Sequence, residues 1–264
     1  MKKVKGMFLL RCLGVYMRHV SLYADWYYHV PAIKHDFCSS GLSGFKHSLV
    51  LDDVDLSVGY SFGNPELAEV LARRYGARAE NVFCSGEGAS GQNVRLIRCL
   101  AERGGAKDEA VVEFPVYEPL QRQVQEFYPR LKRLERRADE GFRLDADRLR
   151  KVVSDRTGLL VLTNPHAPSG APAGKSELKE IMDVAAECGF YVLCDEIYAE
   201  FDRQALPTAF SVNGDFGVVT TSFTKAYGLG GLKLGVALAG KALVDVFNAD
   251  MMNTAGNSPN VVNL

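Results

Sequence analysis

Apolar and polar positions along the chain follow two different periodicities. Runs of four to six mostly apolar residues, many of them β-branched, each end at a small or polar residue and are followed by a stretch with helical spacing. These runs predict strands at 81–84, 110–114, 158–163, 190–194, 218–221 and 234–239. Because strands buried on both faces and joined by helices form parallel sheets, the pattern predicts a three-layer α/β/α fold with a mainly parallel sheet.

Three helices are predicted around these strands. The stretch 176–189 has apolar residues at the i, i+3, i+4 and i+7 positions of one helical face, with Ser176 as its expected N-cap and Gly189 as its expected end. A second helix is predicted over 65–76, and a third follows the glycines at 86–91. The third helix is expected to turn four residues inward: Val94, Ile97, Leu100 and Ala101. The charge-rich segment 130–151 is interpreted as a solvated stretch that enters a helix.

The composition narrows the class of partner. The chain is 47% hydrophobic and 24% charged, with a net charge of -1, which gives no electrostatic reason to expect nucleic acid or an anionic membrane. Small molecules are the expected ligands. The six cysteines are scattered, so neither a zinc site nor a disulfide framework is predicted, and a cytoplasmic location is expected. A secretion signal is not predicted, because Arg11 interrupts the first apolar run; Met17 is an alternative start.

Polar residues follow five of the predicted strands at the point where each strand ends. The stretches are SGEGASGQN, PVYEP, NPHAPSG, DEIY and SFTK. In an open α/β sheet the carboxyl ends of the strands lie along one edge, where loops and helix N-termini bind ligands. The sequence therefore predicts one site that collects a glycine-rich turn, an aromatic ring, an asparagine, a carboxylate and a lysine.

These stretches, together with an earlier one, resemble the class I/II aminotransferases, which are pyridoxal-phosphate enzymes of fold type I. The matching stretches are YSFGNPELAEVLARRYG, GAS at 88–90, FPVYEPL, NPHAPSG, CDEIYAEF and SFTKAYGLGGLKLG. The resemblance covers most of the chain from about Asp36 onward, and the last stretch is the most specific. It implies pyridoxal 5'-phosphate as cofactor, an amino acid and a 2-oxo acid as substrates, an N-terminal arm over 1–45 and a cofactor-binding large domain over 46–264.

Lys225 resembles the Schiff-base lysine of that family. The resemblance implies that its amine holds the cofactor aldehyde covalently and moves protons at the substrate Cα. Ser222, Thr224 and Lys233 would surround the cofactor phosphate. The glycines around them would let backbone N–H groups approach that phosphate, where a Cβ would intrude.

The resemblance also assigns roles around the cofactor ring. Asp195 would face the pyridine nitrogen and keep it protonated, so that the ring accepts the electron pair released at Cα. Tyr198 would reach the O3′ oxygen of the ring with its hydroxyl. Tyr117 is placed like the aromatic residue that stacks on the ring.

The phosphate loop and the subunit contact are also implied. Gly88, Ala89 and Ser90 are aligned with the loop that seats the phosphate at a helix N-terminus, and SGEGA from Ser85 is an alternative register. Tyr60 resembles the tyrosine that reaches the phosphate of the neighbouring subunit. A homodimer with shared sites is therefore implied.

The sequence departs from the family pattern in three ways. Ala167 stands where an asparagine usually bonds O3′, and Asn164 either touches the cofactor or serves only its turn. Lys233 replaces the usual arginine, so weaker cofactor retention is expected. The chain stops at Leu264, before the C-terminal small domain that carries the family's carboxylate-binding arginine. We therefore expect a truncated or split gene, a fragment, or a protein that works without that clamp.

Alternative functions stay open at this point. The first is an aminotransferase. Another fold type I reaction, such as that of a C–S lyase or a decarboxylase, would use the same lysine and aspartate. A truncated, non-catalytic relic that binds the cofactor, or nothing, is the alternative from a different class. A P-loop or dinucleotide-binding protein is disfavoured, because the chain has neither GxxxxGK[ST] nor GxGxxG after the first strand.

Overall fold

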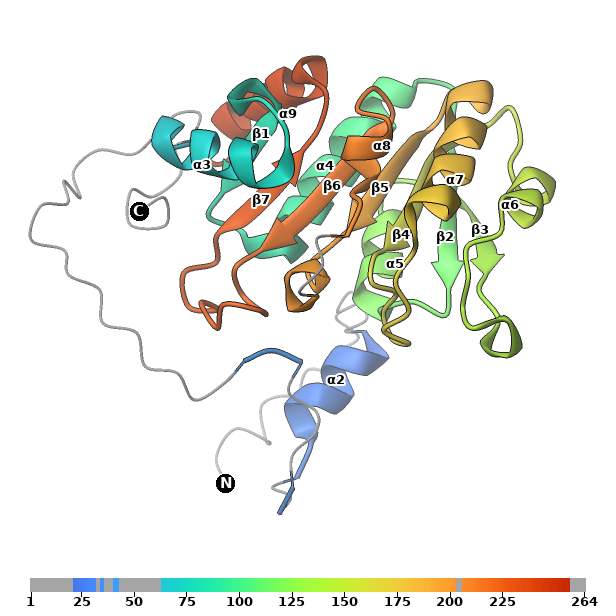
Figure 1. Ribbon diagram of the computed structural model, residues 1–264, viewed down its shortest axis with the longest axis horizontal. Coiled ribbons are helices and arrows are strands. Elements are labelled where there is room, and N and C mark those ends of the chain that lie inside the picture. The colour runs from blue at the N-terminus through green and yellow to red at the C-terminus, as the bar shows by residue number, and fades with distance from the viewer. Residues whose placement is uncertain (1–20, 32–33, 36–39, 43–62, 203–205, 257–264) are drawn as a thin grey trace, which may run out of the picture. The chain divides into compact units, whose positions relative to one another are not determined.

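A computed structural model of the chain describes residues 21–31, 34–35, 40–42, 63–202 and 206–256 (Figure 1). The chain divides into two compact units, within residues 1–38 and 39–264. In the first unit, helix α2 (Leu22–His29) is capped by the hydroxyl of Ser21, which accepts from the Ala24 N–H at 2.9 Å. The other elements described below belong to the second unit.

A seven-stranded sheet forms the middle layer of the second unit, with the order β1-β7-β6-β5-β4-β2-β3. The strands are β1 (Val82–Ser85), β2 (Glu109–Phe114), β3 (Arg130–Glu135), β4 (Thr157–Thr163), β5 (Tyr191–Asp195), β6 (Gly217–Ser222) and β7 (Gly235–Leu238). Neighbours from β3 to β6 are parallel, and β7 is antiparallel to β6 and β1. The mainly parallel sheet is confirmed, and each of the six predicted strands lies within one residue of its predicted bounds.

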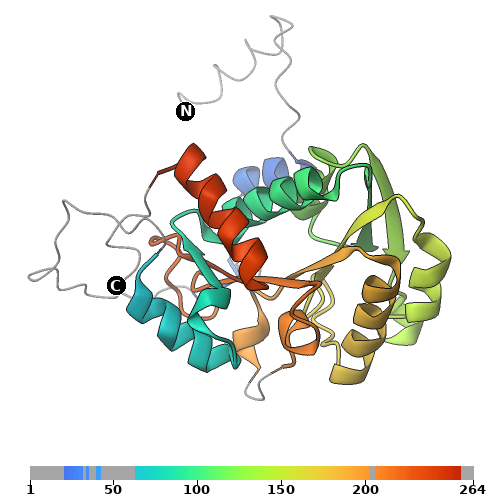
Figure 2. The ribbon, with the colours of Figure 1, turned by 90° about the horizontal axis from the view of Figure 1, so that it is seen from above.

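Helices cover both faces of this sheet (Figure 2). One face carries α4 (Gly88–Gly104), α5 (Glu118–Gln125) and α9 (Lys241–Thr254). The other carries α3 (Pro65–Tyr75), α6 (Ala146–Val152), α7 (Lys175–Cys188) and α8 (Ala209–Val212). Because side chains alternate along a strand, Leu193 of β5 packs on the α4 side and Val192 on the α7 side. The three-layer α/β/α architecture is confirmed.

The two ends of helix α7 test the capping residues that were predicted from the sequence. It ends at Gly189, which has a φ of 69°, as predicted. Its N-cap is Gly174 and not Ser176: the Gly174 N–H donates to Glu177 Oε2 at 2.9 Å, and Ser176 already lies in the first turn. The prediction of Ser176 as N-cap is wrong because a carboxylate three residues on satisfies the free N–H.

The charge-rich segment 130–151 begins with a strand, which the sequence interpretation missed. Strand β3 pairs in parallel with β2 at the edge of the sheet. Leu134 is fully buried, while Arg130 and Glu135 are exposed. Charged side chains on an edge strand protect its open backbone groups from other strands, so the charge pattern is compatible with a strand. The predicted entry into a helix is confirmed by α6.

Helix α4 presents a face to the sheet that differs slightly from the predicted one. Ile97 and Leu100 are fully buried, as predicted. Val94 and Ala101 are only partly buried. Asn93 takes the inward position next to Val94 and is 2% exposed. A polar side chain thus lies in the apolar stripe of this helix.

Candidate active site

Asp195 and Lys225 lie at the carboxyl ends of two neighbouring parallel strands, on the edge to which the arrowheads of β4, β5 and β6 point in Figure 1. Asp195 is the last residue of β5 and pairs with Thr220 of β6. Lys225 comes three residues after Ser222, the last residue of β6. Burial raises the pKa of Asp195 and lowers that of Lys225, and the charge of each residue opposes the shift of the other. The structure thus brings these two predicted residues together.

The carboxyl group of Asp195 is buried and hydrogen-bonded. Burial raises its pKa above the usual value, and three groups oppose this rise: Asn93, Ile197 and Lys225. Asn93 Nδ2 donates to Oδ2 at 2.8 Å, and the Ile197 N–H donates to Oδ1 at 3.1 Å. A buried carboxylate held in this way is suited to pair with a cationic N–H group.

The amine of Lys225 lies in a partly buried position. Burial lowers its pKa, the charge of Lys233 lowers it further, and Asp195 opposes both. Its Nζ donates to Ser40 Oγ at 2.6 Å and lies 5.9 Å from the centroid of the Tyr198 ring. A lysine with a lowered pKa is a better nucleophile near neutral pH. The distance from Nζ to the Tyr198 ring also places Tyr198 beside Lys225.

The glycine-rich loop after β6 contacts the start of α4. The Gly88 N–H donates to the carbonyl of Lys233 at 2.5 Å, and both residues have positive φ, 65° and 56°. A Cβ at Gly235 would clash with the side-chain oxygen of Gln92 and would lie 2.7 Å from the carbonyl oxygen of Gly88. A glycine at 235 is therefore required for this close approach.

The other predicted phosphate residues surround the same contact. Ala89 is buried and Ser90 exposed in the first turn of α4, where the helix dipole favours an anion. Ser222 is buried at the end of β6, and its hydroxyl accepts from the Thr224 N–H at 3.2 Å. The side chain of Lys233 is exposed. Helix start, hydroxyls and lysine thus belong to one small region of the sheet edge.

Tyr117 lies directly before α5 and is 40% exposed. Helix α5 is tied to the first turn of α4, because Gln123 Nε2 donates to the Ser90 carbonyl at 3.3 Å. Tyr60 lies outside the residues that the structure describes.

Asn164 is engaged in its own turn. It is buried, its Oδ1 accepts from the Ala173 N–H at 2.9 Å, and its Nδ2 donates to the Pro207 carbonyl at 3.5 Å. Ala167 is anchored through its backbone, whose N–H donates to Thr163 Oγ1 at 2.8 Å. Of the two roles left open for Asn164, the geometry favours support of the turn.

Two further residues form hydrogen bonds with Asp195 or Lys225 and were not predicted from the sequence. Asn93 holds Asp195, and Ser40 holds Lys225. Asn93 carried a readable signal, because an asparagine in the inward stripe of a helix needs a polar partner. Ser40 carried no such signal, since it lies in a segment without periodicity.

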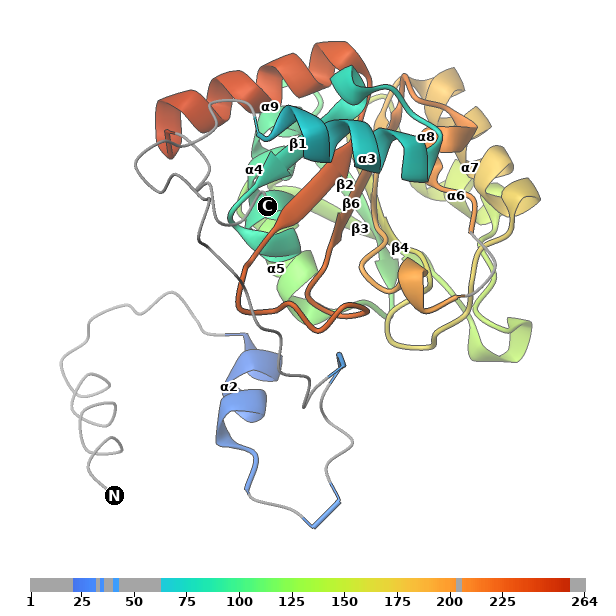
Figure 3. The same ribbon diagram turned by 60° about the vertical axis from the view of Figure 1, so that its left-hand side comes forward.

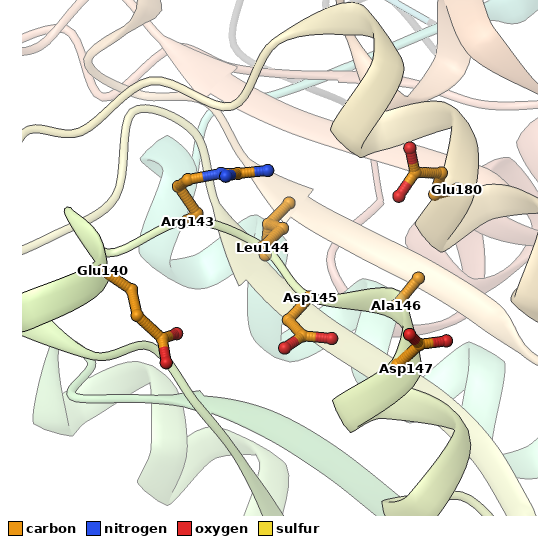
Figure 4. Close-up of a pocket in the computed structure, with 7 residues that line it drawn as sticks. All are labelled: Glu140, Arg143, Leu144, Asp145, Ala146, Asp147 and Glu180. Atoms are coloured by element: carbon orange, nitrogen blue, oxygen red, sulfur yellow. The ribbon is translucent and has the colours of Figure 1, made fainter.

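A separate hollow of about 410 Å³ lies beside α6 and α7 (Figure 4). Its lining includes four carboxylates and one arginine: Glu140, Asp145, Asp147, Glu180 and Arg143. None of them belongs to the predicted site. Within the described parts of the chain, no three His, Cys, Asp or Glu residues are grouped to hold a metal ion. No helix there is long and apolar enough to cross a membrane.

Comparisons with known proteins assign most of the chain to one family. The profile of the family "Aminotransferase class I and II" matches residues 53–262. A histidinol-phosphate aminotransferase from Methanocella arvoryzae is 32% identical over 170 residues, which are 64% of this chain and 45% of that protein. An aromatic amino acid aminotransferase from Rhodococcus jostii is 31% identical over 185 residues, 69% of this chain and 49% of that protein.

Solved structures share the fold. A PLP-dependent aminotransferase from Streptococcus suis superposes with a TM-score of 0.73 at 24% identity, over 81% of this chain and 56% of that one. An aspartate aminotransferase from Thermus thermophilus gives a TM-score of 0.71 at 23% identity, over 78% and 55%. The chain spans about half the length of the curated relatives that it matches.

Proposed function

Because the chain belongs to the class I and II aminotransferases, we propose that it binds pyridoxal 5'-phosphate through Lys225 and moves an amino group between an amino acid and a 2-oxo acid. One observation carries the proposal: a partly buried lysine and a buried carboxylate interact at the carboxyl ends of β6 and β5. The two groups match the chemistry that this cofactor needs, an amine for its aldehyde and an anion for its ring nitrogen.

The residues at this edge fit the parts of the cofactor. Lys225 supplies the amine, and Asp195 the carboxylate for the ring nitrogen. The first turn of α4 would bind the phosphate. This turn can approach the glycine-rich loop because Gly235 has no side chain. The residues proposed to hold the phosphate are Gly88, Ala89, Ser90, Ser222, Thr224 and Lys233.

When bound, the cofactor supplies a protonated pyridine ring that accepts the electron pair released at the substrate Cα. Asp195 would accept a hydrogen bond from the ring N–H and stabilise its positive charge. Lys225 would hold the cofactor covalently, and its free amine would remove and return the proton at Cα, for which a lowered pKa is suitable. Tyr117 would cover one face of the ring.

Tyr198 is proposed as the donor to the O3′ oxygen of the cofactor. Its ring lies 5.9 Å from Lys225 Nζ, so its hydroxyl belongs to the same region as the amine. Ala167 has no side-chain donor to add there. We therefore expect the ring oxygen to depend on Tyr198 more than in relatives with an asparagine at that place.

The proposal extends to the assembly. It includes a cytoplasmic homodimer in which Tyr60 reaches the phosphate of the partner, an arm over 1–45 and a large domain over 46–264. The net charge of -1 supports small-molecule substrates over nucleic acid or an anionic membrane. Gel filtration coupled to light scattering tests the dimer directly.

The decisive experiment is a titration of the purified protein with pyridoxal 5'-phosphate, followed by its visible absorbance. We expect a lysine-bound absorption band that is absent from Lys225→Ala. Asp195→Asn should keep the covalent bond but bind the cofactor more weakly, because the ring nitrogen loses its anionic partner. A band of unchanged position and height in Lys225→Ala would refute the assignment of the lysine.

Amino-group transfer is tested by adding amino donors to the loaded protein. Histidinol phosphate, aromatic amino acids and aspartate form the first panel, because the similar proteins are named for them. Conversion of the bound cofactor to its amine form with one of them supports the proposal. An intact lysine-bound cofactor that no donor converts would favour the non-catalytic relic.

A further inference from the structure

Asn93 bridges Asp195 and Thr220 inside the protein. Its Nδ2 donates to Asp195 Oδ2 at 2.8 Å, and its Oδ1 accepts from the Thr220 hydroxyl at 2.7 Å. Asn93 is 2% exposed and Thr220 is fully buried. The three side chains form one buried chain of hydrogen bonds that runs from β6 through α4 to β5.

The sheet register explains why these three side chains meet. Asp195 and Thr220 are opposite each other on the parallel strands β5 and β6. Leu193 and Val218, two residues earlier on each strand, pack on the α4 side of the sheet. Because side chains two apart point to the same face, Asp195 and Thr220 also face α4. Asn93 is the residue of α4 that reaches both.

The orientation of the Asn93 amide follows from the chemistry of its partners. An ionised carboxylate only accepts hydrogen bonds, so the NH₂ group must face Asp195. The amide oxygen then faces Thr220, whose hydroxyl rotates to donate. Thr220 therefore holds the amide in the one orientation that stabilises the charged carboxylate.

We propose that Asn93, oriented by Thr220, is a positioning residue that keeps the Asp195 carboxylate ionised and directed at the ring nitrogen of the cofactor. The inference rests on the proposed function. Lys225 is the charged group that favours the charged form of Asp195. Burial raises the pKa of the adjacent Glu196, and the charge of Asp195 raises it further; the Glu196 carboxylate accepts from the Ala209 N–H of α8 on the opposite face. Burial opposes the charged form of Asp195, and the hydrogen bonds from Asn93 and the Ile197 N–H favour it, together with the charge of Lys225.

The test compares two ligands that differ only at the ring nitrogen. Dissociation constants are measured for pyridoxal 5'-phosphate and for its 1-deaza analogue, in which a carbon replaces that nitrogen. We expect the wild-type chain to prefer the natural cofactor. Asn93→Leu, which is close in size but cannot donate, should reduce this preference by about tenfold, the size of one hydrogen bond to a charged group.

Two more variants separate positioning from structure. Thr220→Val removes the hydroxyl that orients the Asn93 amide and leaves Asp195 unchanged. It should therefore also reduce the preference for the natural cofactor, but less strongly than Asn93→Leu. If Asn93→Leu does not fold, Thr220→Val decides whether Asn93 has this role. Asn81→Leu is the matched control, because Asn81 is also buried and donates to the Ala239 carbonyl at 3.0 Å, outside the site. It should lower stability and leave the preference unchanged.

The outcomes distinguish a failure of the role proposed for Asn93 from a failure of the proposed function. A wild-type preference that survives in both Asn93→Leu and Thr220→Val overturns the role of Asn93. Equal weakening of both ligands, with the ratio unchanged, also overturns it, because a purely structural defect acts on both. A wild-type chain that does not distinguish the ligands contradicts the proposed function itself.

Discussion

Gly235 of β7 lies so close to Gln92 of α4 that no side chain fits between them. A Cβ at 235 would clash with the amide oxygen of Gln92 and would lie 2.7 Å from the carbonyl oxygen of Gly88. A side chain can rotate away, but the carbonyl of Gly88 moves only if the start of α4 moves. This contact therefore sets the distance between the glycine-rich loop and the helix end proposed to bind phosphate.

Gly235→Ala should lower the free energy of unfolding by about 1–3 kcal/mol, the usual cost of overpacking a close contact. Urea denaturation measures it. Gly231→Ala is the matched control, because an added Cβ there meets no atom within 4 Å. Its stability should be unchanged or slightly higher. Equal stabilities of the two variants would contradict the close-packing explanation.

Asp250 should anchor α9 to α4. It accepts from Arg98 at 2.5 and 2.6 Å and also pairs with Arg95, which is 5% exposed. Asp250→Ala would leave the buried Arg95 with only part of its counter-charge, so we expect a loss of about 2–3 kcal/mol in unfolding free energy.

The control for Asp250 lies on the same helix. Asp245 pairs with Lys241 at 2.7 Å, and both side chains are exposed. Asp245→Ala should therefore change the unfolding free energy by no more than about 0.5 kcal/mol. A loss at Asp250 as small as that at Asp245 would mean that the Arg95 cluster does not stabilise the contact between the two helices.

His166 should make stability depend on pH. Burial, with a contribution from the charge of Arg136, lowers the pKa of His166 to about 4, and its Nε2 donates to the Pro115 carbonyl at 2.8 Å. The unfolded chain takes up that proton near pH 6.5, whereas the folded chain takes it up near 4. The stability due to neutral His166 is thus full above pH 6.5 and is lost toward pH 4, by about 1.4 kcal/mol per pH unit.

The measurement is the difference in unfolding free energy between the wild-type chain and His166→Asn, followed from pH 7 to pH 4.5. We expect this difference to shrink as the pH falls. Glu113, whose pKa is raised by burial to about 7, titrates in both proteins, so its effect cancels in the difference. A difference that stays constant over this range would show that His166 does not cause the dependence.

Ser40 should tune the amine of Lys225 in the cofactor-free protein. Its hydroxyl accepts from Nζ at 2.6 Å and so favours the charged amine. Ser40→Ala should lower the pKa of Lys225 further and raise its rate of acylation at pH 8 by about two- to tenfold. Mass spectrometry of the peptide that contains Lys225 measures the rate of acylation. The exposed Lys241 is an internal control, and its rate should not change.

The six apolar strands could be predicted because each is a nearly continuous apolar run. The meeting of their loops could be predicted because it follows from the direction of the chain in a parallel sheet. Strands such as 158–163 are apolar at nearly every position, since both faces are covered. In a parallel sheet, chain direction alone determines the edge at which Asp195 and Lys225 meet.

The missed features depend largely on contacts between segments that are far apart in the chain. Strand β3 is an edge strand with one fully buried side chain, Leu134, so it resembles a charged surface stretch. Asn93 could be assigned to Asp195 only after the register of β5 and β6 was known. Ser40 reaches Lys225 from a position 185 residues earlier in the chain, which no spacing rule anticipates.

The pairing of β1 with β7 has a consequence for biosynthesis. Val82 is opposite Leu238, 156 positions later, so the two strands lie side by side although they are far apart in the chain (Figure 3). While the nascent polypeptide leaves the ribosome, β2 to β6 can assemble in order. Among the strands that the structure describes, β1 has no neighbour until β7 has been made. A polypeptide released before Gly235 would leave β1 without its partner and β6 with an open edge, and both would be available to strands of other molecules.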